Sequence, residues 1–195
     1  VCDDFWISVA FLTTSGVASL HNSLKNYSSL NKGKGQIFVS DYLSFTQPEA
    51  LKRISRFENI EVRLLSGYDF HGKVYLFRIG DQFDCLVGSS NLTAAALSKN
   101  SELNIHFSAN GPSKIVNNFL KIFSSYYNSA NPVSDELIAR YSQVYEQQFI
   151  STGTPTSDVS ITETKPTTNL ASRSGGDTRP PHSFEQPNPN IIENK

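Results

Sequence analysis

The sequence has 195 residues, which is enough for one domain with a sizeable core and too few for two domains of ordinary size. The longest apolar run, Phe5 to Leu12, is too short to cross a bilayer and no export signal is recognisable, so we expect a cytoplasmic protein without membrane association. A formal net charge of −1 argues against a nucleic-acid binder that acts through charge alone, but it is compatible with a local phosphate-binding patch.

The N-terminal part of the chain alternates between strand and helix patterns. The apolar run from Phe5 to Leu12 predicts a buried strand, and apolar residues from Val17 to Tyr27 recur at helical spacing. A second strand is expected from Gln36 to Ser40. A helix is expected from Thr46 to about Phe57, because Thr46 and Glu49 have the spacing of a capping box.

The rest of the first 150 residues continues this alternation. Strands are expected from Ile60 to Leu65, from His71 to Arg78 and from Phe83 to Gly88, the last two joined in a hairpin by a turn at Gly80 and Asp81. The remaining expected elements are a helical turn at Thr93–Leu97, a strand at Glu102–Phe107, a helix with an apolar stripe between Ile115 and Tyr126, and a helix that begins at a Ser134 cap. An α/β sandwich, with a central mixed β-sheet flanked by helices on both faces, accounts for this order.

Composition divides the chain near residue 150. Residues 1–150 carry the strand and helix patterns and are expected to form one domain, whereas residues 151–195 are dominated by Thr, Ser, Pro, Asn and Gly. Such a segment cannot bury a core, so we expect a disordered tail or linker; an ordered arm that folds on a partner is the alternative. Because the sequence has no methionine, even at position 1, we expect the domain to be N-terminally truncated. Cys2 and Cys85 lack metal-binding spacing and are expected to be free buried thiols.

Three short segments carry side chains suited to phosphate chemistry: residues 70–74 (FHGKV), residues 88–91 (GSSN) and Glu102. His71 and Lys73 occupy alternate positions of an expected strand, so they are predicted to project from the same side of the sheet. Phosphodiester hydrolysis needs a nucleophile or base, together with cations or donors at the non-bridging oxygens. The residues that supply such groups here are His71, Lys73, Ser89 and Asn91.

This arrangement resembles the phospholipase D superfamily, whose signature is His-x-Lys followed by Gly-Ser-x-Asn. The resemblance implies a phospholipase D-like sandwich fold in which His71 attacks phosphorus to form a phosphohistidine. The equivalent histidine of a second half-site then protonates the leaving oxygen, and no metal or other cofactor takes part. Lys73, Ser89 and Asn91 are the phosphate-binding residues that the resemblance implies.

The sequence departs from the superfamily pattern at one position. The aspartate usually found five residues after the lysine is replaced by Arg78. In the nuclease branch, an acidic residue after the Gly-Ser-x-Asn segment orients the histidine, and the segment SELNIHF that contains Glu102 resembles that feature. The catalytic residues implied by the resemblance are therefore His71, Lys73, Asn91 and Glu102.

The motif occurs once, as it does in dimeric nucleases of the superfamily such as metal-independent restriction endonucleases. The resemblance therefore implies an endonuclease that hydrolyses nucleic acid, DNA in particular, as a homodimer in which two chains complete the active site. One alternative is a DNA-binding or regulatory module of a larger restriction or defence system, with little turnover of its own. The other is a lipid phosphodiesterase, against which the absence of an amphipathic membrane-binding stretch counts.

Other polar residues have weaker patterns. His21 is expected on a solvated helix face, His106 as a structural strand residue, and Ser90 as a turn residue. Residues 40–42 (Ser-Asp-Tyr) follow a strand and either line a substrate cleft or form an ordinary loop. The basic residues that either contact the DNA backbone or form solvated faces are Lys32, Lys34, Lys52, Arg53 and Arg56.

Overall fold

The computed structural model describes residues 1–30, 32–67, 70–111 and 113–152, the last four of these by their backbone alone. All described residues belong to one compact unit. Residues 153–195, and with them nearly all of the expected tail, lie outside the described part of the chain. The tail and the domain boundary near residue 150 therefore stay predictions.

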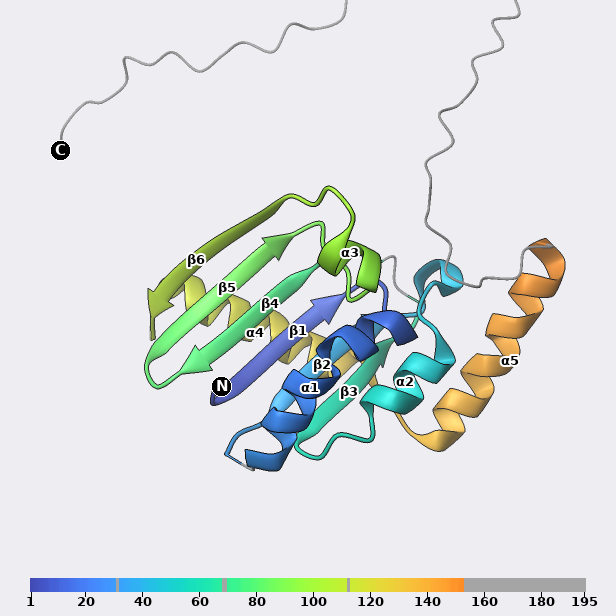
Figure 1. Ribbon diagram of the computed structural model, residues 1–195, viewed down its shortest axis with the longest axis horizontal. Coiled ribbons are helices and arrows are strands. Elements are labelled where there is room, and N and C mark those ends of the chain that lie inside the picture. Colours follow the sequence, from blue (N-terminus) through green and yellow to red (C-terminus); the bar gives the residue numbers. More distant parts are fainter. Residues whose placement is uncertain (31, 68–69, 112, 153–195) are drawn as a thin grey trace, which may run out of the picture. The chain divides into compact units, whose positions relative to one another are not determined.

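The described residues form a seven-stranded mixed sheet (Figure 1). Its strands are β1 (Asp4–Val9), β2 (Gly35–Ser40), β3 (Ile60–Leu65), β4 (Val74–Ile79), β5 (Gln82–Gly88), β6 (Asn104–Asn110) and β7 (Asn131–Pro132). They lie in the order β6-β5-β4-β1-β2-β3-β7, with β1, β2 and β3 parallel and every other neighbouring pair antiparallel. The carboxyl ends of β1, β2, β3 and β5 and the amino ends of β4 and β6 therefore share one edge.

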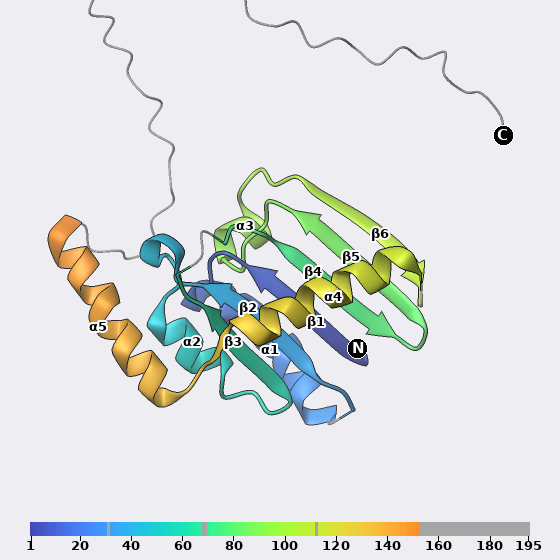
Figure 2. The ribbon, with the colours of Figure 1, turned by 180° about the vertical axis from the view of Figure 1, so that it is seen from behind.

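Helices cover both faces of this sheet. Among the described residues they are α1 (Thr14–Leu30), α2 (Pro48–Ile54), α3 (Ala94–Ser98), α4 (Lys114–Ser129) and α5 (Asp135–Thr152), together with a 3-10 turn, η1 (Tyr42–Ser44). Helices α1, α2 and α3 lie on one face (Figure 1), α4 runs across the other (Figure 2), and α5 packs beside α2. The expected α/β sandwich, a central mixed sheet flanked by helices on both faces, is confirmed.

Two apolar cores lie on either side of the sheet. One packs Ile37 and Val39 of β2 against α1, α2 and α5, while the other packs Phe38 of the same strand against α4. Because successive strand residues point to opposite faces, an unbroken apolar segment such as Ile37–Val39 is buried on both sides. This is why the central strands were recognisable from short apolar runs.

The expected strand from His71 to Arg78 is too long at its start. Strand β4 begins at Val74, which pairs with Ser8 at the end of β1 and with Val87 of β5. Just before that point, Gly88 N donates to Lys73 O at 3.2 Å, outside the strand itself. His71 and Lys73 therefore lie in the connection before the strand, and the prediction that they alternate along a strand is wrong.

Other sequence-based boundaries also differ from the structure. Glu102 precedes β6, which begins at Asn104, so it lies in a loop rather than in the strand. Thr46 does not cap α2: the N-cap residue is Gln47, and the Thr46 hydroxyl donates to Ser40 O at 2.6 Å. Glu49 pairs with Arg53 instead of closing a capping box, so the predicted box is wrong.

Candidate active site

The candidate residues come from three separate segments that meet at one edge of the sheet. His71 and Lys73 precede β4, the GSSN segment closes β5, and Glu102 precedes β6. Backbone hydrogen bonds join the segments, from Gly88 N to Lys73 O at 3.2 Å and from Ser89 N to Leu103 O at 3.1 Å. The antiparallel β4-β5-β6 meander thus brings residues 71–73, 88–91 and 102 together.

His71 and Lys73 are in direct contact. Lys73 Nζ lies 2.8 Å from His71 Nδ1 and 3.2 Å from His71 Nε2, and it also donates to His71 O at 2.8 Å. The Lys73 side chain is 6% exposed, whereas His71 is exposed. The predicted partnership of imidazole and ammonium is therefore present, although a loop rather than a strand produces it.

Two aromatic rings flank the imidazole of His71. Phe11, which follows β1, packs edge-on against it with ring centroids 5.6 Å apart, and Tyr42 of η1 does so at 6.1 Å. Phe11 in turn packs against Phe45, with ring centroids 4.8 Å apart. The rings restrict the imidazole while leaving it accessible, which is the condition for a side chain that must attack a substrate.

The pKa values of both groups are lowered by their surroundings. Desolvation lowers the pKa of His71, and the neighbouring Lys73 ammonium lowers it further. Desolvation also lowers the pKa of Lys73, against which the Glu102 carboxylate raises it. The arrangement favours a neutral imidazole beside a cation, and Glu102 helps to keep that cation charged.

Asn91 is oriented by a backbone group from the start of the chain. Its Oδ1 accepts a hydrogen bond from Phe11 N at 3.0 Å. Around this bond, Leu92 N donates to Phe11 O at 3.2 Å and Thr13 N donates to Leu92 O at 3.2 Å. Because the amide oxygen of Asn91 is engaged, its NH₂ group is the part of the side chain that is left to donate to an anion.

Ser89 and Glu102 form a second pair across the edge. The Ser89 hydroxyl donates to Glu102 Oε2 and accepts from Leu103 N at 3.0 Å, while Asn100 Nδ2 donates to Glu102 Oε1 at 3.3 Å. The structure therefore connects Glu102 to the GSSN segment, and through its charge to Lys73. Direct binding of phosphate by Ser89 and orientation of His71 by Glu102 stay predictions.

Gly88 and Ser90 hold the GSSN segment against β6. A Cβ at Gly88 would lie 2.2 Å from Leu103 O, so only glycine permits this approach. Ser90 is buried, where its hydroxyl accepts from Asn104 Nδ2 at 2.7 Å and its carbonyl accepts from the Tyr75 hydroxyl at 3.0 Å. These contacts agree with the expected turn role of Ser90.

Comparison with known families shows the family to which the chain belongs. Residues 4–127 match the family model described as "Cardiolipin synthase, PLD-like domain". The chain belongs to the phospholipase D superfamily. This is a superfamily of phosphodiesterases, and the two motif segments that meet at the sheet edge both lie within the matched residues.

Two solved structures are similar to this chain at low sequence identity. NucT from Helicobacter pylori is similar with a TM-score of 0.51 and 17% identity, over 67% of this chain and 82% of that chain. Polyphosphate kinase from Porphyromonas gingivalis has a TM-score of 0.48 and 14% identity, over 75% of this chain and 24% of that chain. A comparison with curated proteins finds no significant match.

Arg78, which replaces the usual phospholipase D aspartate, lies at the opposite end of β4 from His71. Its guanidinium pairs with Asp4 Oδ2, with Nε at 2.8 Å, and lies 3.9 Å from Asp3. Arg78 therefore fastens β4 to the start of β1. This departure from the phospholipase D pattern leaves the site untouched.

His21 and His106 have partners outside this phospholipase D site. His21 packs against Phe57, and His106 lies 3.5 Å from Asp84. Cys2 and Cys85 are free, but only Cys85 is fully buried. No three His, Cys, Asp or Glu side chains gather as metal ligands within the described residues.

The sequence did not identify the two aromatic residues beside His71, Phe11 and Tyr42, as parts of the site. Phe11 was assigned to a buried strand, but β1 ends at Val9 and the ring turns to His71. Tyr42 lay in a segment left open between cleft and loop, and it contacts both His71 and a neighbouring cavity. The position of Tyr42 after a strand, at the same edge as the motif, was the available signal.

None of the helices in the described ranges is both long and apolar enough to cross a membrane.

Proposed function

We propose that this phospholipase D-like domain is a metal-independent endonuclease that hydrolyses DNA through a phosphohistidine on His71. The observation that supports it best is the contact of Lys73 Nζ with the His71 ring at 2.8 Å, at an edge where Asn91 and Glu102 also gather. A neutral imidazole next to a cation is suited to attack on an anionic diester. The imidazole is the nucleophile and the cation offsets the negative charge that builds up on the phosphoryl oxygens.

The proposed reaction has two displacements at phosphorus. In the first, a ring nitrogen of His71 forms a P–N bond, the P–O bond to the leaving strand breaks, and that oxygen takes a proton from a second histidine. In the second, water attacks the phosphohistidine, the P–N bond breaks, and the water proton passes to the second histidine. Lys73 and the NH₂ group of Asn91 bind the non-bridging oxygens in both steps.

The proposal includes a homodimer, because the mechanism needs a general acid. Of the histidines among the described residues, His21 and His106 are engaged elsewhere, with Phe57 and Asp84 respectively. A second copy of the chain, with its own His71 facing the first, supplies the missing proton donor. A restriction-endonuclease-like role is the corresponding biological proposal.

The test is cleavage of supercoiled plasmid DNA by the purified chain in excess chelator. We expect nicking and linearisation that are lost in His71→Ala and retained in the matched control His106→Ala. An acid-labile covalent link between the protein and one DNA strand, absent from His71→Ala, is the expected chemical signature. A strict requirement for magnesium, or full activity of His71→Ala, is incompatible with the proposal.

A second candidate function is hydrolysis or transfer of a lipid phosphodiester. The observation in its favour is the description of the matching family model, which names cardiolipin synthase. The same purified chain is therefore incubated with anionic phospholipid vesicles and the products are separated by chromatography. Formation of phosphatidate or cardiolipin, with no cleavage of DNA, favours this candidate over the nuclease.

A further inference from the structure

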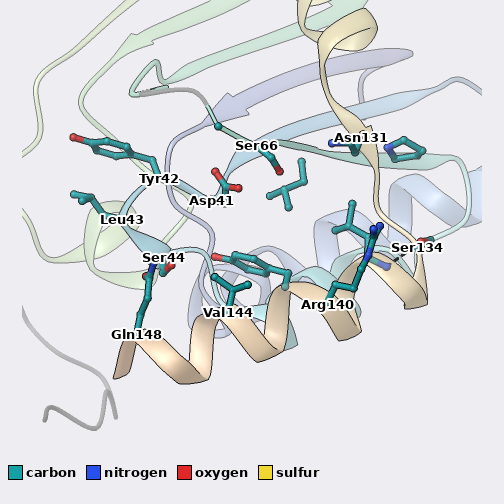
Figure 3. A pocket seen from close by; sticks show the side chains of 15 residues that line it. Asp41, Tyr42, Leu43, Ser44, Ser66, Asn131, Ser134, Arg140, Val144 and Gln148 are labelled. Atoms are coloured by element: carbon teal, nitrogen blue, oxygen red, sulfur yellow. Dashed lines mark hydrogen bonds between the residues drawn. The ribbon is translucent and has the colours of Figure 1, made fainter. Parts of the chain in front are cut away.

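An open cavity of about 850 Å³ adjoins the candidate active site. Its walls come from η1, the end of β3, the start of β7 and one face of α5 (Figure 3). Tyr42 lines the cavity and also packs against His71, with ring centroids 6.1 Å apart. The cavity therefore begins where the scissile phosphate is expected, and its volume falls within the usual range of ligand sites, roughly 300–1,000 Å³.

The residues that line the cavity differ in chemical character from one end of it to the other. Tyr42 and Leu43 lie at one end, Asn131 and Arg140 at the other, and Asp41 and Ser66 project between them (Figure 3). An aromatic face binds a nucleobase by stacking, and carboxylate and hydroxyl groups hydrogen-bond to base edges. Guanidinium groups bind phosphate with two parallel hydrogen bonds. The order along the cavity, from aromatic ring through polar groups to guanidinium, therefore fits one nucleotide followed by a phosphate.

The turn that forms the active-site end of the cavity has strained backbone. Leu43 and Ser44 have φ angles of 52° and 53°, in the left-handed region that non-glycine residues rarely adopt. The turn is held by hydrogen bonds from Tyr42 N to Ser40 Oγ at 2.8 Å and from Ser44 N to Asp41 O at 2.9 Å. Strain of this kind is concentrated at ligand-binding segments, and here it places Leu43, 62% exposed, at the cavity rim.

The opposite wall is firmly attached to the domain. Leu137, Ile138 and Tyr141 of α5 are buried, and the Tyr141 hydroxyl donates to Thr46 O at 2.7 Å. Arg140, the only basic residue of α5, stands on this wall. Helix α5 also lies beyond residues 4–127, the part that matches the family model, so the cavity depends on an element outside the shared domain. A rigid wall lowers the entropy cost of binding.

We propose that this cavity binds the nucleotide adjacent to the scissile phosphate, with its base against Tyr42 and the next phosphate of the strand at Arg140. The inference rests on the proposed nuclease function and adds to it a subsite built by η1 and α5. In this arrangement the strand runs from His71 along the cavity towards Arg140. The subsite thus sets the strand's position at the reacting histidine.

The test compares Arg140→Gln with Lys121→Gln, which removes one positive charge at an exposed residue of α4 outside the cavity. Each variant is assayed on a short DNA duplex or single strand and on bis(4-nitrophenyl) phosphate, which has no second phosphate for Arg140 to bind. We expect Arg140→Gln to raise the KM for DNA about tenfold or more, through loss of a charge-assisted contact, with little change in kcat. Lys121→Gln is expected to match wild type on both substrates.

Other outcomes reject the subsite alone or reject the nuclease function together with it. If wild type cleaves DNA and Arg140→Gln has an unchanged KM, the subsite is rejected and the nuclease function stands. If Arg140→Gln loses kcat/KM equally on both substrates, its effect is on folding and the subsite is again rejected. If wild type hydrolyses the small diester but cleaves no DNA, the nuclease function fails, and the nucleotide subsite fails with it.

Discussion

The amide oxygen of Asn91 accepts a hydrogen bond from the backbone N–H of Phe11, across 80 residues of sequence, at 3.0 Å. One side chain thereby links the end of β1 to the motif after β5. The same bond leaves the NH₂ group of Asn91 directed elsewhere, as a donor for phosphate. Two substitutions separate these roles.

Asn91→Ala removes both roles, whereas Asn91→Asp keeps the acceptor for Phe11 and removes the donor. We expect Asn91→Ala to lower the free energy of unfolding by about 1–3 kcal/mol, because the Phe11 N–H loses its partner. Asn91→Asp is expected to unfold within about 1 kcal/mol of wild type but to lose about 100-fold or more in kcat. Urea denaturation and cleavage assays measure the two effects, with exposed Asn22→Ala as the control. Equal stability of the two Asn91 variants contradicts the assigned bond.

The pH dependence of His71 follows from its surroundings. Desolvation, and then the Lys73 charge, lower its pKa below the ordinary value of about 6.5, so the imidazole stays neutral as the pH falls through 6.5. The unfolded chain binds that proton more readily, so this histidine makes the fold less stable as the pH falls below about 6.5. NMR titration of the His71 ring is expected to give a midpoint below 6.5, and Lys73→Gln is expected to raise it. A wild-type midpoint at or above 6.5 contradicts the prediction.

The charge of Lys73 lowers the pKa of His71, whereas the charge of Glu102 raises the pKa of Lys73. Desolvation lowers that pKa and the Glu102 carboxylate raises it, so Glu102→Gln is expected to lower it further. Activity that depends on the charged ammonium should then fall at a lower pH on the alkaline side than it does in wild type. Glu58→Gln, at an exposed glutamate far along the chain, is the control. An unchanged alkaline limb in Glu102→Gln excludes this electrostatic role.

Much of the fold was predictable because its signals are local. Strand β3 was predicted at its observed bounds and β2 and β5 to within one residue, since buried strands are short apolar runs between turn residues. The start of β4 was not predictable in this way. It depends on where β1 ends and where β5 returns, as the pairing of Val74 with both Ser8 and Val87 shows.

The residues of the candidate site also fall into two groups: those that a local sequence motif identified and those that only the folded chain brings together. His71, Lys73, Ser89, Asn91 and Glu102 were identifiable because the motif spacing is local, and the structure brings them to one edge. Phe11 and the cavity beyond Tyr42 were not, because ring contacts and cavity walls arise from segments that meet only in the folded chain. Residues of α5 near position 140 and the turn near residue 42 line the same cavity. No local sequence pattern predicts that these two distant segments meet.

Gly16 is a position where helix propensity and packing give opposite predictions. A Cβ there would lie 2.0 Å from Leu92 O and 2.9 Å from Thr93 Cα, because α1 packs directly on the segment that follows Asn91. Gly16→Ala is therefore expected to destabilise the protein by about 1–3 kcal/mol and to reduce activity. Propensity alone predicts stabilisation of about 1 kcal/mol in a helix. Ser19→Ala, exposed on the same helix, is the control for propensity, and denaturant midpoints compare the two. A stabilised Gly16→Ala contradicts the close approach.

Leu43 is a position where stability and substrate binding should respond in opposite directions. Its φ of 52° is unfavourable for leucine and better tolerated by asparagine, which the chain already uses at Asn59 with a φ of 61°. Leu43→Asn is therefore expected to raise the free energy of unfolding by up to about 1 kcal/mol, because the exposed leucine loses little packing when it is replaced.

The same substitution removes an apolar side chain from the cavity rim beside Tyr42. We expect Leu43→Asn to raise the KM for DNA several-fold, while the rate on bis(4-nitrophenyl) phosphate reports any disturbance of His71 itself. Leu30→Asn is the matched control, since Leu30 is exposed at the end of α1 and lies outside the cavity. It should bring neither the gain in stability nor the loss in DNA binding. A variant at Leu43 that gains stability and keeps its KM shows that the strain has no bearing on the substrate.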